Sequence, residues 1–540
     1  MPIFLDISVF LWYNRSMKNA DVNDKLINEN TTLRNRVTEL ETLVTYYEEQ
    51  FRLAQHRRFG ASSEKSVYDN AQLHMLDEVF NEAEVSASDV PEPELVEIEK
   101  HYRKRRRLIG DKLPDDLPVD VVEHTLPEDE RVCPECKGTL HAMGRETRRE
   151  LVIVPAQVKI REHIRYTYSC RRCENENVIV PIIKADVPVP VIKGSFASPE
   201  AIAHIMTQKF VMAVPLYRQE QEWHRQGIQL SRQTMSNWLI RCAEDYLTPI
   251  YERMKALLLK REVLHGDETT LRVINEQGKE TGGKSYMWLY RTSGDTEKHI
   301  VLYDYRPDRR AAHPKDFLAD FNGYLHADGY DGYHSLPEGI TVVGCWAHLR
   351  RKFDEALKSM PEPSRNGSDT MRGKRYCDKL FELEKTFAGL SYEDRYERRL
   401  EKSEPLMDQF FAWADKVGRE AAPKGALGKA VYYAASQRVY LERYLLDGKL
   451  EISNNRAERS IKPFVIGRKN WLFSNTAKGA KASAVIYSII ETAKENGVNP
   501  FAYLVYIFNN APNIDIHGDA DALDSLLPWA APDSCRERIQ

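Results

Sequence analysis

The chain has 540 residues, of which 42% are hydrophobic and 29% are charged, and its formal net charge is -4. This composition indicates a soluble globular protein of about two to four domains, and so small a net charge neither favours nor excludes nucleic acid as a partner. No apolar run approaches the roughly 18 residues that a membrane-spanning helix needs. The apolar stretch from Pro2 to Tyr13 is short and lacks a basic leader, so it predicts no signal peptide. We therefore expect a cytoplasmic protein.

The first predicted element is a helix with a heptad repeat in residues 17–60. Residues 1–16 are interpreted as an apolar extension upstream of a native start at Met17. Two sets of residues at seven-residue spacing form the a/d seam of a coiled coil: Leu26, Leu33, Leu40, Tyr47 and Ala54, with Asn30, Val37, Val44 and Phe51. The alternative is a helix that packs on its own chain, but the seam favours self-association. A homodimer or higher oligomer is therefore expected.

Residues 61–127 predict a linker that is first acidic and then basic. Between Glu64 and Glu99 there are 11 acidic residues and a single basic one, and a basic cluster follows at residues 103–107. A cluster of this kind docks on phosphates or belongs to a solvated linker, and both interpretations stay open.

Two Cys-x-x-Cys pairs predict a zinc ribbon in residues 128–182. The four cysteines are Cys133, Cys136, Cys170 and Cys173. Strand-like segments lie between the pairs at residues 151–154, 158–160 and 163–168. Four thiolates complete a tetrahedral structural site, and a reducing cytoplasm favours metal over disulfides. One structural Zn²⁺ is therefore expected.

Residues 195–260 predict a helical region that fits a helix-turn-helix. One helix begins after Ser198, a second runs from Tyr217 to Arg225, Gly227 makes the turn, and Ser231 caps a third. Arg232 then lies at the start of the third helix, where a recognition helix contacts bases. A plain helical hairpin is an equally good interpretation.

Residues 261–510 predict an α/β core with a helical insertion at about 349–446. Three strands come first: one that ends at Asp267, then residues 286–290 and 299–303. A helix at 311–318 precedes a fourth strand that ends at Asp328 and a fifth at 341–346. This is the order of a ribonuclease-H-like sheet, in which strands one and four are neighbours. The chain is thus predicted to be multidomain α/β.

Three acidic residues occupy settings that suit a divalent-metal site. Asp267 and Asp328 end apolar strands, and Glu458 lies about one turn into a helix capped by Ser453 or Asn454. Two Mg²⁺ about 4 Å apart stabilise the charge that develops when a phosphodiester is cut or joined. Carboxylates suit both Mg²⁺ and Mn²⁺. A single Asp after a strand is more often a turn residue, but the three settings together favour metal.

Other acidic residues compete for these roles. Asp331 is three residues from Asp328, and Glu268 and Asp304 are also close in the sequence. Basic residues in and before the Glu458 segment are candidate DNA contacts: Arg350, Arg351, Arg456, Arg459, Lys462, Arg468 and Lys469. Arg459 is also a candidate to orient Glu458 through a salt bridge.

Four runs carry a resemblance to a known family: LHGDETT at 264–270, HADGYDGY at 326–333, CWAHLRRKF at 345–353 and SNNRAERSIKPFVIGRKNWLFSN at 453–475. They resemble the insertion-sequence-66-type transposases, which are bacterial DDE enzymes on a ribonuclease-H-like fold. The resemblance extends from about residue 26 to about residue 510, and the tail at 511–540 shows no matching motif.

This resemblance implies Asp267, Asp328 and Glu458 as catalytic acids that bind two divalent ions. It implies DNA as substrate, both terminal repeats and target, together with companion proteins of the same element and a nucleoid-associated state in bacteria. Two alternatives remain: a nuclease of this fold without strand transfer, and a non-catalytic, zinc-containing DNA-binding remnant.

Overall fold

The computed structural model describes residues 29–41, 43–53, 158–164, 166–169, 182–184, 186–276 and 283–536. The chain divides into two units, one of Met1–Glu84 with Val189–Glu537 and one of Val85–Pro188 with Arg538–Gln540. The predicted extension 1–16, the linker 61–127 and the four ribbon cysteines lie outside the described residues. Among the residues described, no helix is both long and apolar enough to cross a bilayer.

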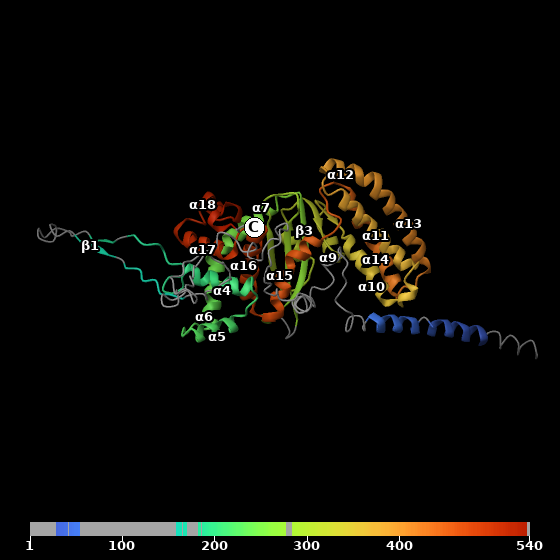
Figure 1. Cartoon of the computed structure of the whole chain (residues 1–540), viewed down its shortest axis with the longest axis horizontal. Helices are drawn as coiled ribbons and strands as arrows, with labels where there is room; N and C mark the ends of the chain where they lie inside the picture. Colours follow the sequence, from blue (N-terminus) through green and yellow to red (C-terminus); the bar gives the residue numbers. More distant parts are fainter. Residues whose placement is uncertain are drawn as a thin grey trace, which may run out of the picture. The chain divides into compact units, whose positions relative to one another are not determined.

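Residues 29–41 and 43–53 are helical, as the heptad repeat predicts, and are drawn in blue in Figure 1. The apolar seam of this helix is exposed: Leu33, Val37, Leu40, Val44, Tyr47 and Phe51 are between 48% and 64% accessible. Exposed apolar seams are unfavourable in water, so self-association through this helix stays a prediction.

The second unit contains a two-stranded antiparallel hairpin, β1 (Thr167–Ser169) with β2 (Ile182–Lys184). β1 confirms the end of the strand predicted at 163–168. The strand predicted at 158–160 is wrong, because residues 158–164 lie outside strands and Ile160 is 96% exposed. An alternating pattern forms a strand only where a neighbour accepts its hydrogen bonds.

A mixed sheet forms the centre of the first unit. Its strands are β3 (Val263–Asn275), β4 (Lys284–Thr292), β5 (Val301–Arg306), β6 (Gly323–His326), β7 (Ile340–Val343) and β8 (Ser474–Thr476). The order is β5-β4-β3-β6-β7, and β8 pairs with β3. β4 runs antiparallel to both of its neighbours, whereas β3, β6 and β7 are parallel. The prediction that the first and fourth strands are neighbours is confirmed, because β3 pairs with β6.

The first strand does not end at Asp267 as predicted. Its parallel pairing with β6 ends at His265, but its antiparallel pairing with β4 continues to Arg272. β3 therefore keeps one hydrogen-bonded neighbour for seven further residues beyond His265. Asp267 lies just past the point where β3 and β6 separate, so its side chain stands at the open edge left by the short strand.

Helices cover the sheet on the side of β5 (Figure 1). They are α4 (Pro199–Phe210), α5 (Leu216–Arg225), α6 (Arg232–Cys242), α7 (Thr248–Leu258), α16 (Ala477–Glu495) and α17 (Pro500–Asn510). Ser198 and Ser231 cap α4 and α6 through their side chains, and Gly227 has a φ of +79° in the turn between α5 and α6. These positions confirm the predicted caps and turn, because a φ of this sign favours glycine.

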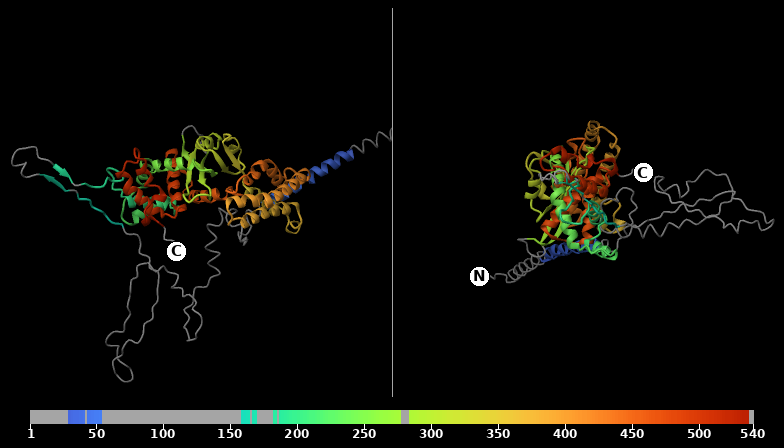
Figure 2. Two further views of the ribbon diagram at one scale, coloured as in Figure 1. Left: turned by 90° about the horizontal axis from the view of Figure 1, so that it is seen from above. Right: turned by 90° about the vertical axis from the view of Figure 1, so that its left-hand side faces the viewer.

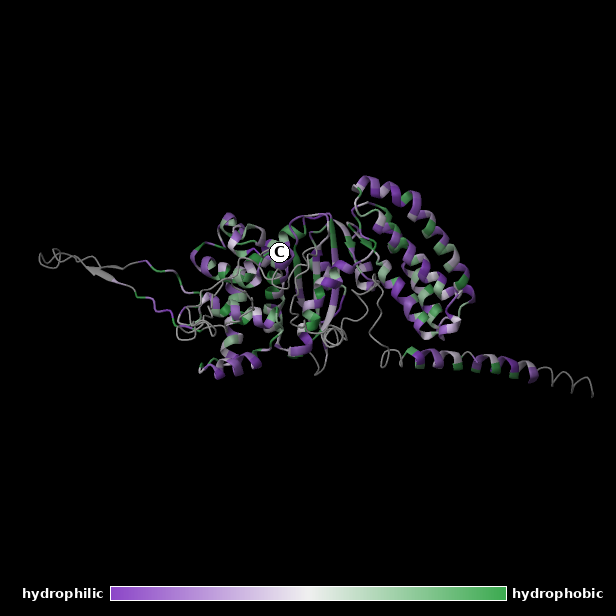
Figure 3. Ribbon diagram, viewed as in Figure 1, coloured by the Kyte–Doolittle hydropathy of each residue, from purple (hydrophilic) through white to green (hydrophobic). Residues whose placement is uncertain are grey.

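The predicted insertion is helical and has its own core. It comprises α10 (Trp346–Ser359), α11 (Asp369–Thr386), α12 (Tyr392–Arg398), α13 (Glu404–Glu420) and α14 (Ala426–Glu442). Figure 1 and the left-hand view of Figure 2 place these helices on the opposite side of the sheet from α16. Green and purple segments alternate along them, as expected of amphipathic helices (Figure 3). Trp346, Phe353 and Phe410 are fully buried among them.

Two short helices connect strands of the sheet: α8 (Ala312–Phe317) lies between β5 and β6, and α9 (Asp331–His334) lies between β6 and β7. After the insertion, α15 (Asn455–Trp471) returns the chain to the sheet. Residues 511–536, which we predicted to be a tail, are folded against the first unit and contain a short helix, α18 (Ala520–Asp524). Leu526 and Leu527 are buried there, and Arg253 of α7 pairs with Asp524 at 2.6 Å. Apolar burial and this ion pair hold the segment against the rest of the unit.

Candidate active site

The strands β3 and β6 carry the same short motif, His-x-Asp, in register. His265 pairs with His326 across the two strands, and their rings stack with centroids 4.5 Å apart. Asp267 and Asp328 each follow two residues later; Asp267 lies within β3, and Asp328 lies two residues beyond the end of β6. This repeat is a signal in the sequence that the analysis of single motifs overlooked.

The three predicted acids meet at this edge. Asp267 and Asp328 come from the strands, and Glu458 projects from the first turn of α15. Burial raises the pKa of Asp267 well above its ordinary value, and the carboxylates of Glu268, Asp328 and Glu458 raise it further. The negative charges of these carboxylates therefore disfavour ionisation of Asp267 unless a cation or a proton intervenes.

Asn454 fixes the start of α15 against β3. It is the N-cap residue, as predicted, but its side chain does not cap the helix. Instead its amide donates to the Gly266 carbonyl at 2.7 Å, and its Oδ1 lies 2.9 Å from Nδ1 of His265. Burial lowers the pKa of His265 to about 4, so the ring is neutral at pH 7. Asn454 is thus used to join helix to strand, which places Glu458 next to Asp267.

Glu458 is held by α10 and not by its own helix. Arg351 Nη2 donates to Glu458 Oε2 at 3.2 Å, so this ion pair replaces the salt bridge expected from Arg459. Arg459 is exposed. His348 Nε2 lies 3.7 Å from Glu458 Oε1. Burial lowers the pKa of His348, but the Cys345 sulfur and the Glu458 carboxylate outweigh burial and raise it to about 9.

The competing acids are occupied elsewhere. Glu268 is buried, and its carboxylate accepts hydrogen bonds from Arg309 at 2.8 Å and from the Tyr333 hydroxyl at 2.8 Å. The side chain of Asp331 is 99% exposed at the start of α9. Neither residue takes the place of Asp267 or Asp328 in this geometry.

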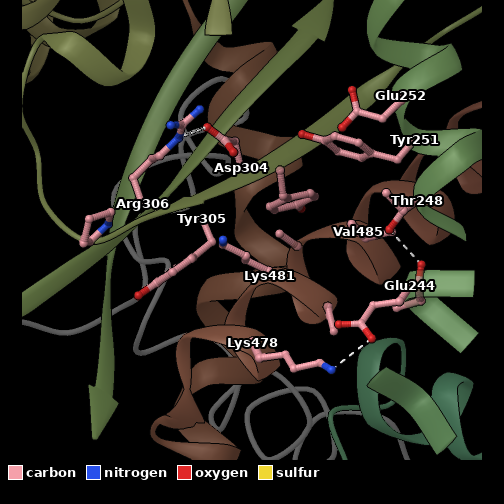
Figure 4. Close-up of a pocket in the computed structure, with 15 residues that line it drawn as sticks. Glu244, Thr248, Tyr251, Glu252, Asp304, Tyr305, Arg306, Lys478, Lys481 and Val485 are labelled. Atoms are coloured by element: carbon pink, nitrogen blue, oxygen red, sulfur yellow. Dashed lines mark hydrogen bonds and ion pairs between the residues drawn. The ribbon is translucent and has the colours of Figure 1, made fainter. Parts of the chain in front are cut away.

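Asp304 lies in a cavity of about 490 Å³ between α7, β5 and α16, away from the three acids. It pairs there with Arg306 at 2.6 Å, and Lys478 pairs with Glu244 at 3.0 Å (Figure 4). The charged groups of this cavity are therefore largely neutralised by one another.

The predicted DNA contacts on α15 divide into two groups. Arg459, Lys462 and Lys469 are spaced so that they follow one side of the helix, where Arg459 and Lys469 are exposed and Lys462 is half-buried. Arg456 and Arg468 turn inward: Arg456 pairs with Glu451 at 2.8 Å, and Arg468 donates to the hydroxyls of Thr269 and Thr270 at 3.2 and 3.1 Å.

The remaining candidates lie on other helices. Arg350 pairs with Asp378 of α11 at 2.5 Å, inside the insertion. Arg232 is 63% exposed at the start of α6 and lies over the Tyr217 ring. Arg351, as described above, is committed to Glu458.

The donor set fits hard divalent cations. Asp267, Asp328 and Glu458 offer carboxylate oxygens, which Mg²⁺ and Mn²⁺ prefer. Glu458 Oε1 is buried and has no hydrogen-bond partner in the described part of the chain, and a bound cation would satisfy it. The neutral His265 is engaged with Asn454, so it supports the acids without joining the donor set.

Sequence comparisons give four adjoining matches to family models. Residues 194–482 match the "Transposase IS66 family", and residues 130–174 match the "zinc-finger binding domain of transposase IS66". Residues 488–529 match the "IS66 C-terminal element", which includes most of the segment presented as a tail. Residues 46–122 match the "Transposase C of IS166 homeodomain". The second match supports a zinc ion in the region of the four cysteines.

Relatives with similar sequences come from Sinorhizobium fredii. The uncharacterized protein y4jD is 31% identical over 430 residues, which are 77% of this chain and 81% of the relative. The uncharacterized protein y4hP is 30% identical over 443 residues, which are 79% of this chain and 77% of the relative. Neither name states an activity, so the chemistry has to be argued from the site.

Proposed function

Because the chain belongs to the IS66 family of transposases, we propose that it cuts DNA at the ends of its element and joins the freed 3′ hydroxyl groups to target DNA. The observation that carries the proposal is the placement of Asp267, Asp328 and Glu458 near one sheet edge, where the carboxylates of Asp328 and Glu458 raise the pKa of Asp267. Membership of the family implies DNA as a partner. The cutting and joining steps are the part that we propose.

The sheet supports a ribonuclease-H-like core. Its order is β5-β4-β3-β6-β7 with β4 antiparallel to its neighbours. The strand pattern predicted for that fold that the first and fourth strands are neighbours, and β3 and β6 are paired in this sheet. We propose residues 261–510 as the catalytic domain and 349–446 as its helical insertion.

Each acid has a role that follows from its position. We propose Asp267, Asp328 and Glu458 as ligands of two Mg²⁺ or Mn²⁺ ions. When bound, such ions stabilise charge on the attacking and leaving oxygens of a phosphodiester. Asn454 and Arg351 set the position of Glu458, and Arg309 with Tyr333 keeps Glu268 turned away. The chain thus presents three carboxylates in fixed positions to the backbone of one DNA strand.

Basic side chains next to the acids suit the DNA backbone. Arg459, Lys462 and Lys469 form a stripe along α15, and we propose that it contacts phosphates. Arg468 lies at the end of this helix above β3, and its described hydrogen-bond partners are uncharged threonine hydroxyls. Arg232 is the corresponding candidate on α6, and Arg350 is a candidate in the insertion.

The N-terminal regions complete the proposal. We propose Cys133, Cys136, Cys170 and Cys173 as the ligands of one structural Zn²⁺, since four thiolates suit a closed tetrahedral site. We propose that the helix at 29–53 joins copies of the chain through its exposed seam, because strand transfer needs two element ends together. Companion proteins of the same element are further proposed partners.

The test is a cleavage and strand-transfer assay on DNA that carries the repeats flanking the gene. Wild-type protein with Mg²⁺ should give nicks at the 3′ ends and joined products, in reactions with and without the neighbouring gene products. Asp267→Asn, Asp328→Asn and Glu458→Gln should each abolish both. Asp331→Asn is the matched control, because this exposed aspartate lies three residues from Asp328 and should leave both products intact.

The alternatives give different results in the same assay. Nicks without joined products would favour a nuclease of the same fold. Binding without any cut, in both kinds of reaction, would favour a DNA-binding remnant. Loss of activity in Asp331→Asn but not in Asp328→Asn would overturn the assignment of the second acid.

A further inference from the structure

Next to the carboxylate site, three side chains of different chemistry come together. Cys345 precedes α10, His348 lies in its first turn, and Glu458 faces them from α15. The cysteine sulfur, a ring nitrogen of the histidine and a carboxylate oxygen all lie within 4.8 Å of one another. The spacing Cys-x-x-His brings the first two to one side of the helix start, since residues three apart are neighbours on a helix.

Two polar atoms in this group lack a hydrogen-bond partner among the described residues, although His348 Nε2 and Glu458 Oε1 are within ion-pair distance. His348 Nδ1 and Glu458 Oε1 are buried, and neither forms a hydrogen bond within the described part of the chain. The 3.7 Å between His348 Nε2 and Glu458 Oε1 is too long for a hydrogen bond. A buried polar atom left without a partner costs about 1–3 kcal/mol. Two such atoms beside a buried sulfur indicate a place that a ligand completes.

The other contacts leave one oxygen of Glu458 available. Arg351 holds Oε2 at 3.2 Å, which leaves Oε1 toward His348 and Cys345. The Cys345 side of the group is also fixed, because its sulfur accepts a hydrogen bond from the Asn454 backbone N–H at 3.2 Å. Three donors on two anchored helix ends therefore surround one small space.

We infer that Cys345, His348 and Glu458 form a second metal site, for a thiophilic divalent cation such as Zn²⁺, that shares Glu458 with the proposed catalytic site. Sulfur, imidazole and carboxylate are the donors that Zn²⁺ takes, whereas Mg²⁺ keeps to oxygen. Three protein ligands leave a fourth position to water. The site is separate from the zinc-finger region at residues 130–174.

If the chain has the proposed function, the two metal sites compete for Glu458. Glu458 Oε1 cannot serve a Zn²⁺ held by Cys345 and His348 and at the same time a catalytic Mg²⁺ with its full geometry. Binding of Zn²⁺ at this group therefore withdraws Glu458 from the other two acids. Zinc is expected to inhibit Mg²⁺-dependent cleavage through this site.

The first test measures binding and needs no activity. Full-length protein is incubated with Zn²⁺, freed of unbound metal, and its zinc content per chain is compared with that of Cys345→Ser, His348→Gln and Cys377→Ser. The first two variants should hold one zinc ion fewer than wild type. Cys377, fully buried in α11, is the matched control and should keep the wild-type content. Circular dichroism establishes that each variant is folded.

Co²⁺ in place of Zn²⁺ reports the ligand type. Wild type should show a thiolate-to-cobalt absorption that exceeds that of Cys345→Ser, and the difference spectrum belongs to this site alone. Equal zinc content and equal cobalt spectra in wild type, Cys345→Ser and His348→Gln would overturn the inference. If Cys345→Ser fails to fold, His348→Gln alone decides it.

The second test adds Zn²⁺ to the Mg²⁺-dependent cleavage reaction. Half-inhibition of Cys345→Ser should need at least roughly tenfold more zinc than that of wild type, because loss of even an outer-shell partner weakens metal binding by this much. Cleavage that zinc inhibits equally in both proteins would overturn the inhibitory role. Zinc binding at the site in a protein that never cleaves DNA would overturn the proposed function and leave the metal site standing.

Discussion

Replacing Asn454 with alanine tests how the site is assembled. Asn454 is 1% exposed and joins the start of α15 to β3 through two side-chain contacts, to His265 at 2.9 Å and to the Gly266 carbonyl at 2.7 Å. Alanine removes both contacts and fills none of the space. His265 and Gly266 are themselves fully buried, so water cannot replace the lost partners.

The expected cost follows from these two groups. Each buried group left without a partner costs about 1–3 kcal/mol, so loss of the two contacts in Asn454→Ala should lower the free energy of unfolding by roughly 2–6 kcal/mol. Glu458 lies one turn beyond Asn454 and should shift with it. A misplacement of about 1 Å at a catalytic group lowers the rate by roughly a hundredfold. We therefore expect a large loss of kcat in the variant molecules that fold.

The assay is urea unfolding followed by tryptophan fluorescence, with the cleavage rate measured in parallel. Asn499→Ala is the matched control, because Asn499 is an exposed N-cap whose side chain accepts a hydrogen bond from the Ala502 N–H at 3.0 Å. Loss of such an ordinary cap costs about 1 kcal/mol. Asn454→Asp is the second variant, since it keeps the shape but turns an acceptor toward the Gly266 carbonyl.

The reasoning would be refuted if Asn454→Ala cost no more stability than Asn499→Ala. If Asn454→Ala were destabilised but had the wild-type kcat under conditions where it is folded, Asn454 would not be needed to position Glu458. Asn454→Asp should be at least as destabilised as Asn454→Ala, and a stable Asp variant would show that the contact to Gly266 contributes little.

Two further predictions concern the surroundings of this contact. Arg351→Met breaks the ion pair with Glu458 and should lower kcat by roughly ten- to a hundredfold with a smaller change in KM, since it misplaces a group needed in the transition state. Arg350→Met is the control, because Arg350 pairs with Asp378, and an equal effect of this variant would contradict the prediction. Burial lowers the pKa of His265 from 6.5 to about 4. The free energy of unfolding is therefore highest above pH 6.5 and falls by roughly 3 kcal/mol as the pH falls toward 4, because the unfolded chain binds a proton in this range and the folded protein does not. The free energy of unfolding of His265→Gln, followed by urea unfolding at several pH values, should therefore fall less between pH 7 and pH 5 than that of wild type, and equal falls would show that His265 is not the group that titrates.

Local signals in the sequence predicted the elements well because their causes are local. The caps at Ser198 and Ser231 and the turn at Gly227 follow from short-range chemistry, and all three occur in the structure. Apolar runs located β3 to β7, whereas the short polar strand β8 was not predicted. The local sequence around each acid identified Asp267, Asp328 and Glu458 as candidates, and the three lie near one edge of the sheet.

The missed features depend on residues far apart in the chain. The partner of Glu458 was expected nearby at Arg459, but it is Arg351, 107 residues earlier. The length of β3 depends on which neighbour continues beyond His265, and no pattern within the strand contains that information. Asn454 could be identified as a cap but not as a tie to β3, because His265 lies 189 residues away.

The insertion explains how such distant residues keep a fixed geometry. The chain enters it beside the point where it leaves: Gly344 N donates to the Tyr440 carbonyl at 2.9 Å, and Trp346 N donates to the Ile452 carbonyl at 3.1 Å. The helices between these residues pack around their own core. An insertion closed at its base in this way adds about a hundred residues to the loop without moving its two ends apart, and the chain-length cost of such a loop grows only slowly.

The first helix of the insertion then acquires two functions. α10 packs Trp346 and Phe353 into the core of the insertion, and the same helix presents Arg351 and His348 to Glu458. Glu458 is thus positioned by a helix that belongs to the core of the insertion, whereas Asp267 is carried by β3 of the sheet.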